Sequence, residues 1–185
     1  FFTHTPANPL LSGLVGSEMC IRDSGNVTWS TGSVLPIWKQ MYKKNKTILT
    51  TGPYMRRFFF SVNEAVSLID QALKLKNKLN GKILSAEMKS AKMIDFLKVW
   101  TKRFGGKYKI IQSRKGDRQD EYLIGEDELK YAKEMKIKNK KYFVIDFNNL
   151  LKKPLKEIVS SENAKRLAQS EIEKIIKFGL KSNDL

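Results

Sequence analysis

The sequence has almost none of the residues that build metal and redox sites. Its 185 residues include one cysteine, Cys20, and one histidine, His4. A single cysteine excludes an internal disulfide. Because a structural metal site needs about four ligands, the sequence predicts no metal centre. No apolar run approaches the roughly 20 residues that a membrane-spanning helix needs. We therefore expect no membrane span in this chain and a cytoplasmic protein, while a membrane anchor elsewhere in an intact protein stays open.

Arginine is scarce, whereas lysine is abundant. Only seven of the 35 basic residues are arginine, and the formal net charge is +16. Such a charge fits nucleic acid, an anionic membrane or a small anionic substrate. The lysines are spread along the chain, and AT-rich coding sequence produces a lysine surplus without selection for binding. We interpret most of them as solvated surface, and a basic nucleic-acid-binding module stays an alternative.

Residues 1–24 differ sharply in composition from the rest of the chain. They hold the only cysteine and the only histidine but no lysine, and all 28 lysines lie in residues 25–185. The segment LVGSEMCIRDS at residues 14–24 resembles a conceptual translation of a transposase-type sequencing-library adapter. We therefore predict that residues 1–24 are non-native and disordered. The alternative is a natural N-terminal tail. Residues 25–185 are predicted to form one domain.

From residue 25 onward, helical and strand patterns alternate, which predicts an α/β or α+β domain. Ser61 and Glu64 fit a capping box, and the helix after them carries an apolar stripe of Val62, Val66, Ile69 and Leu73. Further helices are predicted at residues 34–44, at 90–104, at 126–133 and after a capping box at 170–173. Strands are predicted at 47–50, 58–60, 82–85, 108–111 and 142–145.

No strand in this pattern is followed by a glycine-rich phosphate loop. Neither Gly32-Ser33 nor Gly105-Gly106 fits G-x-G-x-x-G, so the sequence contains no dinucleotide fingerprint. Tyr42 and Lys46 have the spacing of a catalytic Tyr-x-x-x-Lys pair, but they lie where their helix should end. The sequence therefore predicts neither a cofactor loop nor a catalytic pair in this chain.

Three polar motifs stand out from the apolar framework. Two of them bring together arginines of an arginine-poor chain, and guanidinium groups bind phosphate oxygens through paired hydrogen bonds. A structural ion pair at Arg57 and a solvated turn at residues 113–121 are the alternatives. The motifs are Gly25-Asn26-Val27 with Gly32-Ser33-Val34-Leu35-Pro36, then Gly52-Pro53-Tyr54-Met55-Arg56-Arg57-Phe58-Phe59, then Ser113-Arg114-Lys115-Gly116-Asp117-Arg118-Gln119-Asp120-Glu121.

In order and spacing, these motifs resemble the CapD-like polysaccharide-biosynthesis branch of the extended short-chain dehydrogenase/reductases. That branch includes UDP-N-acetylglucosamine 4,6-dehydratases and related epimerases. Residues 25–27 match its Gly-Asn-Val turn, and residues 114–121 match its Arg-Pro-Gly-Glu-Lys-x-x-Glu loop. Residues 52–58 match Asp-Pro-x-Met-Thr-Arg-Phe, but Gly52 replaces the aspartate and Arg56 replaces the threonine. The resemblance spans residues 25–185.

The resemblance implies an α/β fold, namely the C-terminal portion of an extended short-chain dehydrogenase/reductase (NAD(P)-binding Rossmann) fold. This portion comprises the small substrate-binding subdomain and one or two late sheet strands. The intact enzyme is expected to be a homo-oligomer that uses NADP and a UDP-sugar. In such enzymes a hydride leaves sugar C4, water is lost across C5 and C6, and the hydride returns. The catalytic half is expected to be absent here, so the fragment alone is predicted to be inactive.

The same resemblance implies roles for five residues. Asn26 is expected near the sugar or its diphosphate. Arg57 and Arg114 are expected to clamp the diphosphate. Asp117 is expected to hold the ribose, and Glu121 to order its loop. A UDP-sugar 4-epimerase of the same family is the first alternative, and a non-catalytic scaffold domain is also open.

Overall fold

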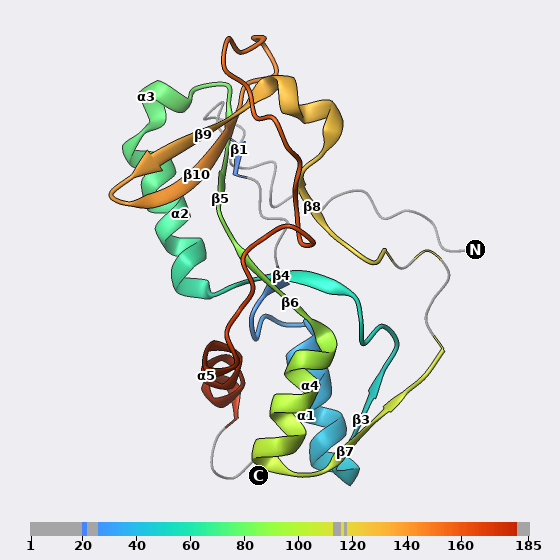
Figure 1. Cartoon of the computed structure of the whole chain (residues 1–185). Coiled ribbons are helices and arrows are strands. Elements are labelled where there is room, and N and C mark those ends of the chain that lie inside the picture. Colours follow the sequence, from blue (N-terminus) through green and yellow to red (C-terminus); the bar gives the residue numbers. More distant parts are fainter. Residues whose placement is uncertain (1–19, 22–25, 113–115, 117, 181–185) are drawn as a thin grey trace, which may run out of the picture.

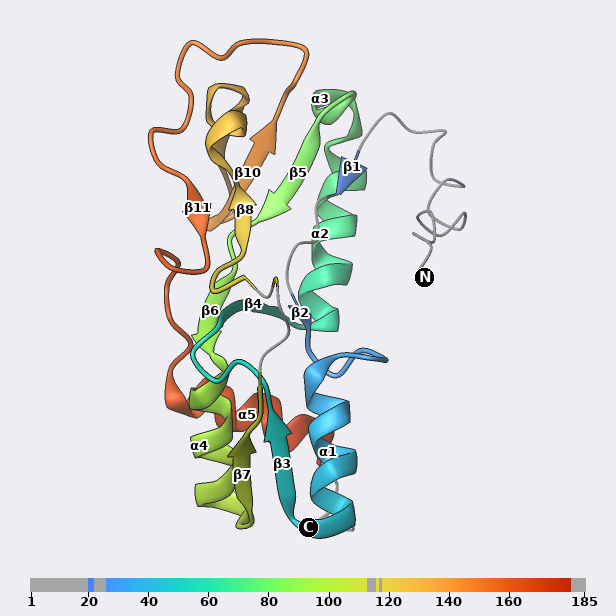
Figure 2. The same cartoon turned by 90° about the vertical axis from the view of Figure 1, so that its right-hand side faces the viewer.

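The described part of the chain has a mixed α/β fold. The computed structural model describes residues 20–21, 26–112, 116 and 118–180. Figures 1 and 2 show an elongated molecule with helices and strands at both ends and short strands crossing between them. The predicted α/β class is confirmed. Within these residues, no helix combines the length and the apolar character that crossing a bilayer requires.

The upper end in Figure 1 is built on a four-stranded sheet with the order β1-β5-β10-β9. Strand β1 runs parallel to β5, whereas β10 is antiparallel to both β5 and β9. Two α-helices, the 3-10 helix η2 and a short antiparallel pair, β8 with β11, complete this end. The elements are β1 (Cys20–Ile21), α2 (Val62–Lys74), α3 (Lys76–Leu79), β5 (Ile83–Ala86), β8 (Tyr122–Ile124), η2 (Glu126–Tyr131), β9 (Ala132–Ile137), β10 (Lys140–Ile145) and β11 (Val159–Ser160).

The lower end combines one parallel strand pair with three helices. Strand β3 (Thr47–Thr50) pairs with β7 (Lys107–Ile110). Figure 2 shows α4 (Met93–Phe104) and α1 (Val34–Asn45) on either side of this pair, with α5 (Gln169–Gly179) behind them. These helices bury a cluster of aromatic and aliphatic side chains centred on Trp100.

A three-stranded sheet joins the two ends, in the order β2 (Asn26–Val27), β4 (Arg56–Phe60) and β6 (Lys89–Lys92). Successive side chains of a strand point to opposite faces. Phe59 therefore lies in the lower core, whereas Phe58 and Phe60 lie in the upper core. Strand β4 thus separates two hydrophobic cores and belongs to both.

Helix α2 begins as predicted but exposes its apolar stripe. The Ser61 hydroxyl accepts a hydrogen bond from the Glu64 amide at 3.2 Å, and the Glu64 carboxylate accepts one from the Ser61 amide at 2.7 Å. Leu68 and Ala72 are buried. The stripe itself is 48 to 60% exposed, at Val62, Val66, Ile69 and Leu73. The helix therefore contacts the sheet through residues beside the stripe.

Two predicted helix starts are wrong. Ser90 lies buried inside strand β6, and α4 begins three residues later, where the Asp95 carboxylate accepts a hydrogen bond from the Lys92 amide at 3.3 Å. The last helix begins at Gln169. The carboxylate that closes its first turn is Glu171, which accepts from the Ala168 amide at 2.9 Å.

Little of the segment predicted to be adapter-derived lies in the described part of the chain. Cys20 and Ile21 form β1, parallel to β5. Residues 1–19 and 22–24 lie outside the described residues. The division of the chain at residue 24 therefore stays a prediction.

Candidate functional site

Three of the five predicted site residues meet where the two ends of the molecule join. Asn26 begins β2, Arg57 is the second residue of β4, and Glu121 directly precedes β8. The parallel pairing of β2 with β4 brings Asn26 beside Phe59. Arg114 and Asp117 lie outside the described residues, so their predicted roles are not tested by the structure.

The carboxylate of Glu121 holds this meeting point together. One oxygen accepts a hydrogen bond from the Phe58 amide at 2.9 Å. The other lies 3.4 Å from both the Asn26 side-chain amide nitrogen and the Arg57 Nε. Burial raises the pKa of Glu121 above its usual value, while the Phe58 amide, Arg57 and Asn26 oppose that shift. Glu121 is therefore a partly desolvated carboxyl group that pairs with Arg57 and accepts hydrogen bonds from Asn26 and the Phe58 amide.

Arg57 uses the rest of its guanidinium group to hold the segment before Glu121. Its terminal nitrogens donate to three backbone carbonyls, those of Arg56 at 2.8 Å, Arg118 at 3.0 Å and Gln119 at 3.3 Å. The side chain is 19% exposed. Arg57 thus ties residues 118–121 to the start of β4.

A second ion pair, not predicted from the sequence, lies on the opposite side of the same strand. Arg56 makes a two-pronged contact with the Asp120 carboxylate, with Nε–Oδ1 at 2.5 Å and Nη2–Oδ2 at 2.6 Å. The same Nη2 lies 2.9 Å from Glu162. The Arg56 guanidinium lowers the pKa of Asp120, and the Ser161 hydroxyl adds to this effect against the cost of burial.

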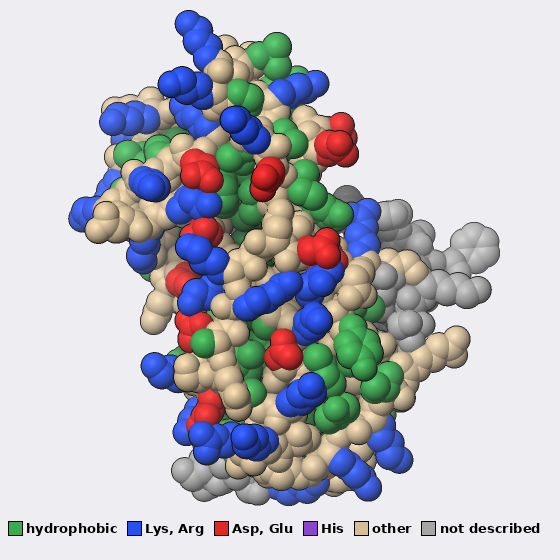
Figure 3. Space-filling model, in the orientation of Figure 1, with side chains coloured by type: hydrophobic (Ala, Val, Ile, Leu, Met, Phe, Trp, Pro, Cys, Tyr) green, Lys and Arg blue, Asp and Glu red, His purple; other side chains and the backbone are tan. Residues whose placement is uncertain are grey.

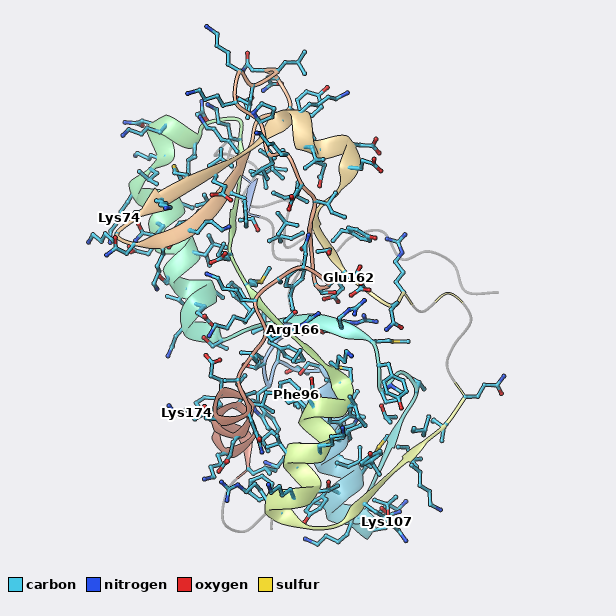
Figure 4. All side chains as sticks on the ribbon, in the orientation of Figure 1. Lys74, Phe96, Lys107, Glu162, Arg166 and Lys174 are labelled. Atoms are coloured by element: carbon cyan, nitrogen blue, oxygen red, sulfur yellow. The ribbon has the colours of Figure 1, made fainter. Side chains whose placement is uncertain are left out.

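The buried Ser161 connects this pair to the C-terminal segment. Its hydroxyl lies 2.9 Å from Asp120 Oδ1 and accepts a hydrogen bond from the Glu121 amide at 3.0 Å. Its carbonyl accepts from Arg166 at 2.6 Å and from the buried Ser90 hydroxyl at 2.7 Å. Figure 4 shows Glu162 and Arg166 beside β4, between the two ends of the molecule.

The signal for the second pair was present in the sequence. Arg56-Arg57 and Asp120-Glu121 are adjacent doublets of opposite charge. In extended backbone, adjacent side chains point to opposite faces. Two such doublets that align therefore form one ion pair on each face, and the structure shows this arrangement.

The described residues show neither a glycine-rich phosphate loop nor a cluster of metal ligands. None of their strands is followed by a glycine-rich loop, which phosphate binding by a Rossmann fold requires. In the same part of the chain, no group of three or more His, Cys, Asp or Glu side chains could hold a metal. Figure 3 shows lysine and arginine over both ends of one face, not gathered into one tract.

Comparisons with known proteins show which family this chain is similar to. The family model described as "Polysaccharide biosynthesis protein" matches residues 12–145. A protein of Methanocaldococcus jannaschii, named as an uncharacterized membrane protein, is 35% identical over 163 residues, which cover 83% of this chain and 47% of that protein. A UDP-glucose 4-epimerase of Rickettsia akari is 28% identical over 171 residues, covering 85% and 49%.

A solved structure shares the fold. The X-ray structure of Pen from Bacillus thuringiensis matches with a TM-score of 0.72 and 26% identity, covering 86% of this chain and 48% of that one. The chain spans about half the length of the curated relatives that it matches. Because the family model matches well over half of the chain, the chain belongs to the polysaccharide biosynthesis protein family, with an α/β fold of the extended short-chain dehydrogenase/reductase type.

Proposed function

We propose that residues 25–185 form the substrate-binding part of a nucleotide-sugar 4,6-dehydratase of the UDP-N-acetylglucosamine type, acting in polysaccharide biosynthesis. The observation that carries the proposal is the meeting of Asn26, Arg57 and Glu121. Asn26 donates to the carbonyl of Phe58, 32 residues away, and to Glu121, 95 residues away, and Arg57 pairs with the same Glu121. The family membership supports a sugar-modifying function, and the order of the polar motifs supports the dehydratase type.

The arrangement around Arg57 suits diphosphate binding by exchange of partners. Arginine binds phosphate oxygens through paired hydrogen bonds, and a phosphate carries a negative charge that a backbone carbonyl lacks. The phosphate oxygens of a nucleotide-sugar would therefore displace the carbonyls of Arg118 and Gln119 from the guanidinium group. Asn26 and Arg57 both contact Glu121, and Asn26 would exchange its Phe58 carbonyl partner for the same ligand. Binding of the diphosphate at two or more donors would fix the sugar at one position and orientation, which lowers the entropic cost of its reaction.

A UDP-sugar 4-epimerase is the second candidate. The Rickettsia relatives carry that name at 26 to 28% identity. The two reactions start from the same kind of substrate but yield different products. A dehydratase releases a 4-keto-6-deoxy sugar nucleotide, which has lost one water. An epimerase yields an isomer of unchanged mass.

The test uses the intact protein, in which NADP would be bound by residues outside the described part of this chain. The purified protein is incubated with UDP-N-acetylglucosamine and NADP, and the products are identified by mass spectrometry and NMR. We expect a product that has lost water. An isomer of unchanged mass would favour the epimerase instead, and substrate that is neither bound nor converted would refute both. Arg57→Lys should weaken binding, because one ammonium cannot replace the paired donors of Arg57.

The matched control is Arg103→Lys. Arg103 pairs with Glu173 at 2.9 Å on the surface of the lower end, and its side chain is 56% exposed. Both variants replace an arginine of an ion pair by lysine. Equal losses of binding in the two variants would argue against a specific role for Arg57.

A further inference from the structure

The segment 118–121 is held to strand β4 from both sides. On the side of Asn26, Arg57 contacts Glu121 and the carbonyls of Arg118 and Gln119. On the opposite side, Arg56 contacts Asp120. Only the Arg57 contacts lie where the proposed substrate binds, and Arg56 faces residues 161 and 162 instead.

The Arg56 side of this attachment is the better enclosed of the two. The side chains of Arg56 and Asp120 are 17% and 12% exposed, compared with 28% for Glu121. Asp120 also contacts the Ser161 hydroxyl, and the Arg56 amide donates to the Gln119 carbonyl at 2.9 Å. A two-pronged arginine–carboxylate contact fixes geometry in addition to adding binding energy.

We propose that Arg56 and Asp120 form a positioning clamp, which keeps residues 118–121 on β4 when Arg57 exchanges its carbonyl partners for the diphosphate of the substrate. Without the clamp, binding would leave the segment that carries Glu121 with fewer contacts to β4. With it, Glu121 keeps its contacts with Asn26 and the Phe58 amide. Neither clamp residue contacts the substrate, so both act through Arg57 and Glu121. The inference rests on the proposed function.

The clamp is a feature of this chain and not of the family motif that the chain resembles. The motif has threonine at the position of Arg56, and the position of Asp120 is variable in it. A threonine is too short to reach a carboxylate on the neighbouring segment with two donors. The segment 160–166 extends the clamp, because Ser161 contacts both Asp120 and the Glu121 amide.

The experiment measures UDP affinity by calorimetry, and kcat and KM for UDP-N-acetylglucosamine, in the intact protein. The variants are Arg56→Thr, Asp120→Asn and the exchange Arg56→Asp/Asp120→Arg. The control is Arg103→Thr, which also removes one arginine from an ion pair. We expect KM and the UDP dissociation constant to rise about tenfold in the single variants, with kcat changed less than about twofold. The exchange variant should recover part of the affinity, because it restores a pair of opposite charges.

A readout of loop order separates positioning from general damage. Hydrogen exchange at the Glu121 amide should accelerate in Arg56→Thr, while exchange in α4 stays as in the wild type. Single variants with unchanged KM, or with lowered kcat at unchanged KM, would overturn the clamp. A wild-type protein that binds neither UDP nor the sugar nucleotide would overturn the proposed function and the clamp with it. If Arg56→Thr does not fold, Asp120→Asn and the exchange variant decide the question.

Discussion

At the scale of single residues, Asp120 and Glu121 are neighbouring carboxyl groups whose surroundings shift their pKa values in opposite directions. The Arg56 guanidinium lowers the pKa of Asp120, whereas burial raises the pKa of Glu121. Both are paired with an arginine, but Arg56 contacts Asp120 at 2.5 Å and Arg57 lies 3.4 Å from Glu121. The closer, two-pronged contact outweighs the cost of burial, and the longer one does not.

These opposite shifts predict opposite pH dependences of stability. Glu121 binds its proton more tightly in the folded chain. The stability of the wild type relative to Glu121→Gln should therefore be greatest below the unfolded-state pKa and should fall as pH rises through the folded-state pKa. Asp120 binds its proton less tightly. The extra stability of the wild type over Asp120→Asn should be full above the unfolded-state pKa of Asp120. It should be lost as pH falls through the folded-state pKa.

The measurement is urea unfolding of the wild type and both variants between about pH 3 and about pH 7, the range in which carboxyl groups titrate. Each variant serves as the reference for one carboxyl group, because its amide does not titrate. Two difference curves that slope in the same direction would contradict the assignment of the two environments.

Ser161 supports a second prediction at this scale. Its buried hydroxyl is a partner for both the Asp120 carboxylate and the Glu121 amide. Ser161→Ala leaves both groups without that partner, so the free energy of unfolding should drop by about 1–3 kcal/mol. Ser170→Ala, at an exposed position in α5, is the control and should have little effect. Chemical denaturation measures both variants. Equal free energies of unfolding for the wild type and Ser161→Ala would show that the Ser161 hydroxyl contributes little.

At the scale of elements, local patterns predicted the longer helices and the five strands β3, β4, β5, β7 and β10, but they missed strands such as β6 and β9. Helix α1 and the start of α2 follow from apolar periodicity and a capping box, which are short-range signals. Strand β9 has the sequence AKEMKI, and its lysines and glutamate hide the alternation of an edge strand. Ser90 has the sequence pattern of a helix cap, although it lies inside strand β6. In the structure the Ser90 hydroxyl instead contacts the distant residues Ser161 and Arg166.

Helix α2 provides a prediction at this scale, because two of its adjacent residues differ strongly in burial. Leu68 is 3% exposed and Ile69 is 48% exposed. Leu68→Ala should lower the free energy of unfolding of this chain by about 2–5 kcal/mol through the cavity that it leaves. Ile69→Ala should cost under about 1 kcal/mol. Chemical denaturation measures both, and a larger effect at Ile69 would show that the exposed stripe is covered in solution.

At the scale of the whole molecule, the site depends on contacts that the sequence does not encode locally. The resemblance to a family supplied Asn26, Arg57 and Glu121, and the structure brings them together. Asp120 and Ser161 were missed, since their roles depend on how distant segments align. Segment 118–121 lies on β4, and residue 161 follows strand β11, which pairs with β8. The two charge doublets indicate the Arg56–Asp120 pair, whereas the contacts of Ser161 follow only from the tertiary fold.

The two cores that meet at β4 give the last prediction. Phe58 and Phe59 are adjacent and both buried, but Phe58 belongs to the upper core and Phe59 to the lower. The Phe59 ring lies 4.4 Å from that of Phe96, near the start of α4 (Figure 4). Phe59→Leu should therefore accelerate amide hydrogen exchange in α4. Phe58→Leu should accelerate it in β10, whose buried residues share the upper core with Phe58.

The effect of these two variants on the site should differ as well. The Phe58 amide donates to Glu121, and Asn26 donates to the Phe58 carbonyl at 3.2 Å. A shift of the backbone at Phe58 would therefore move Glu121, so Phe58→Leu should speed exchange at the Glu121 amide more than Phe59→Leu does. If both variants changed exchange equally at both ends, the chain would have one cooperative core. The site would then depend on the stability of the whole fold and not on the strand that separates its two cores.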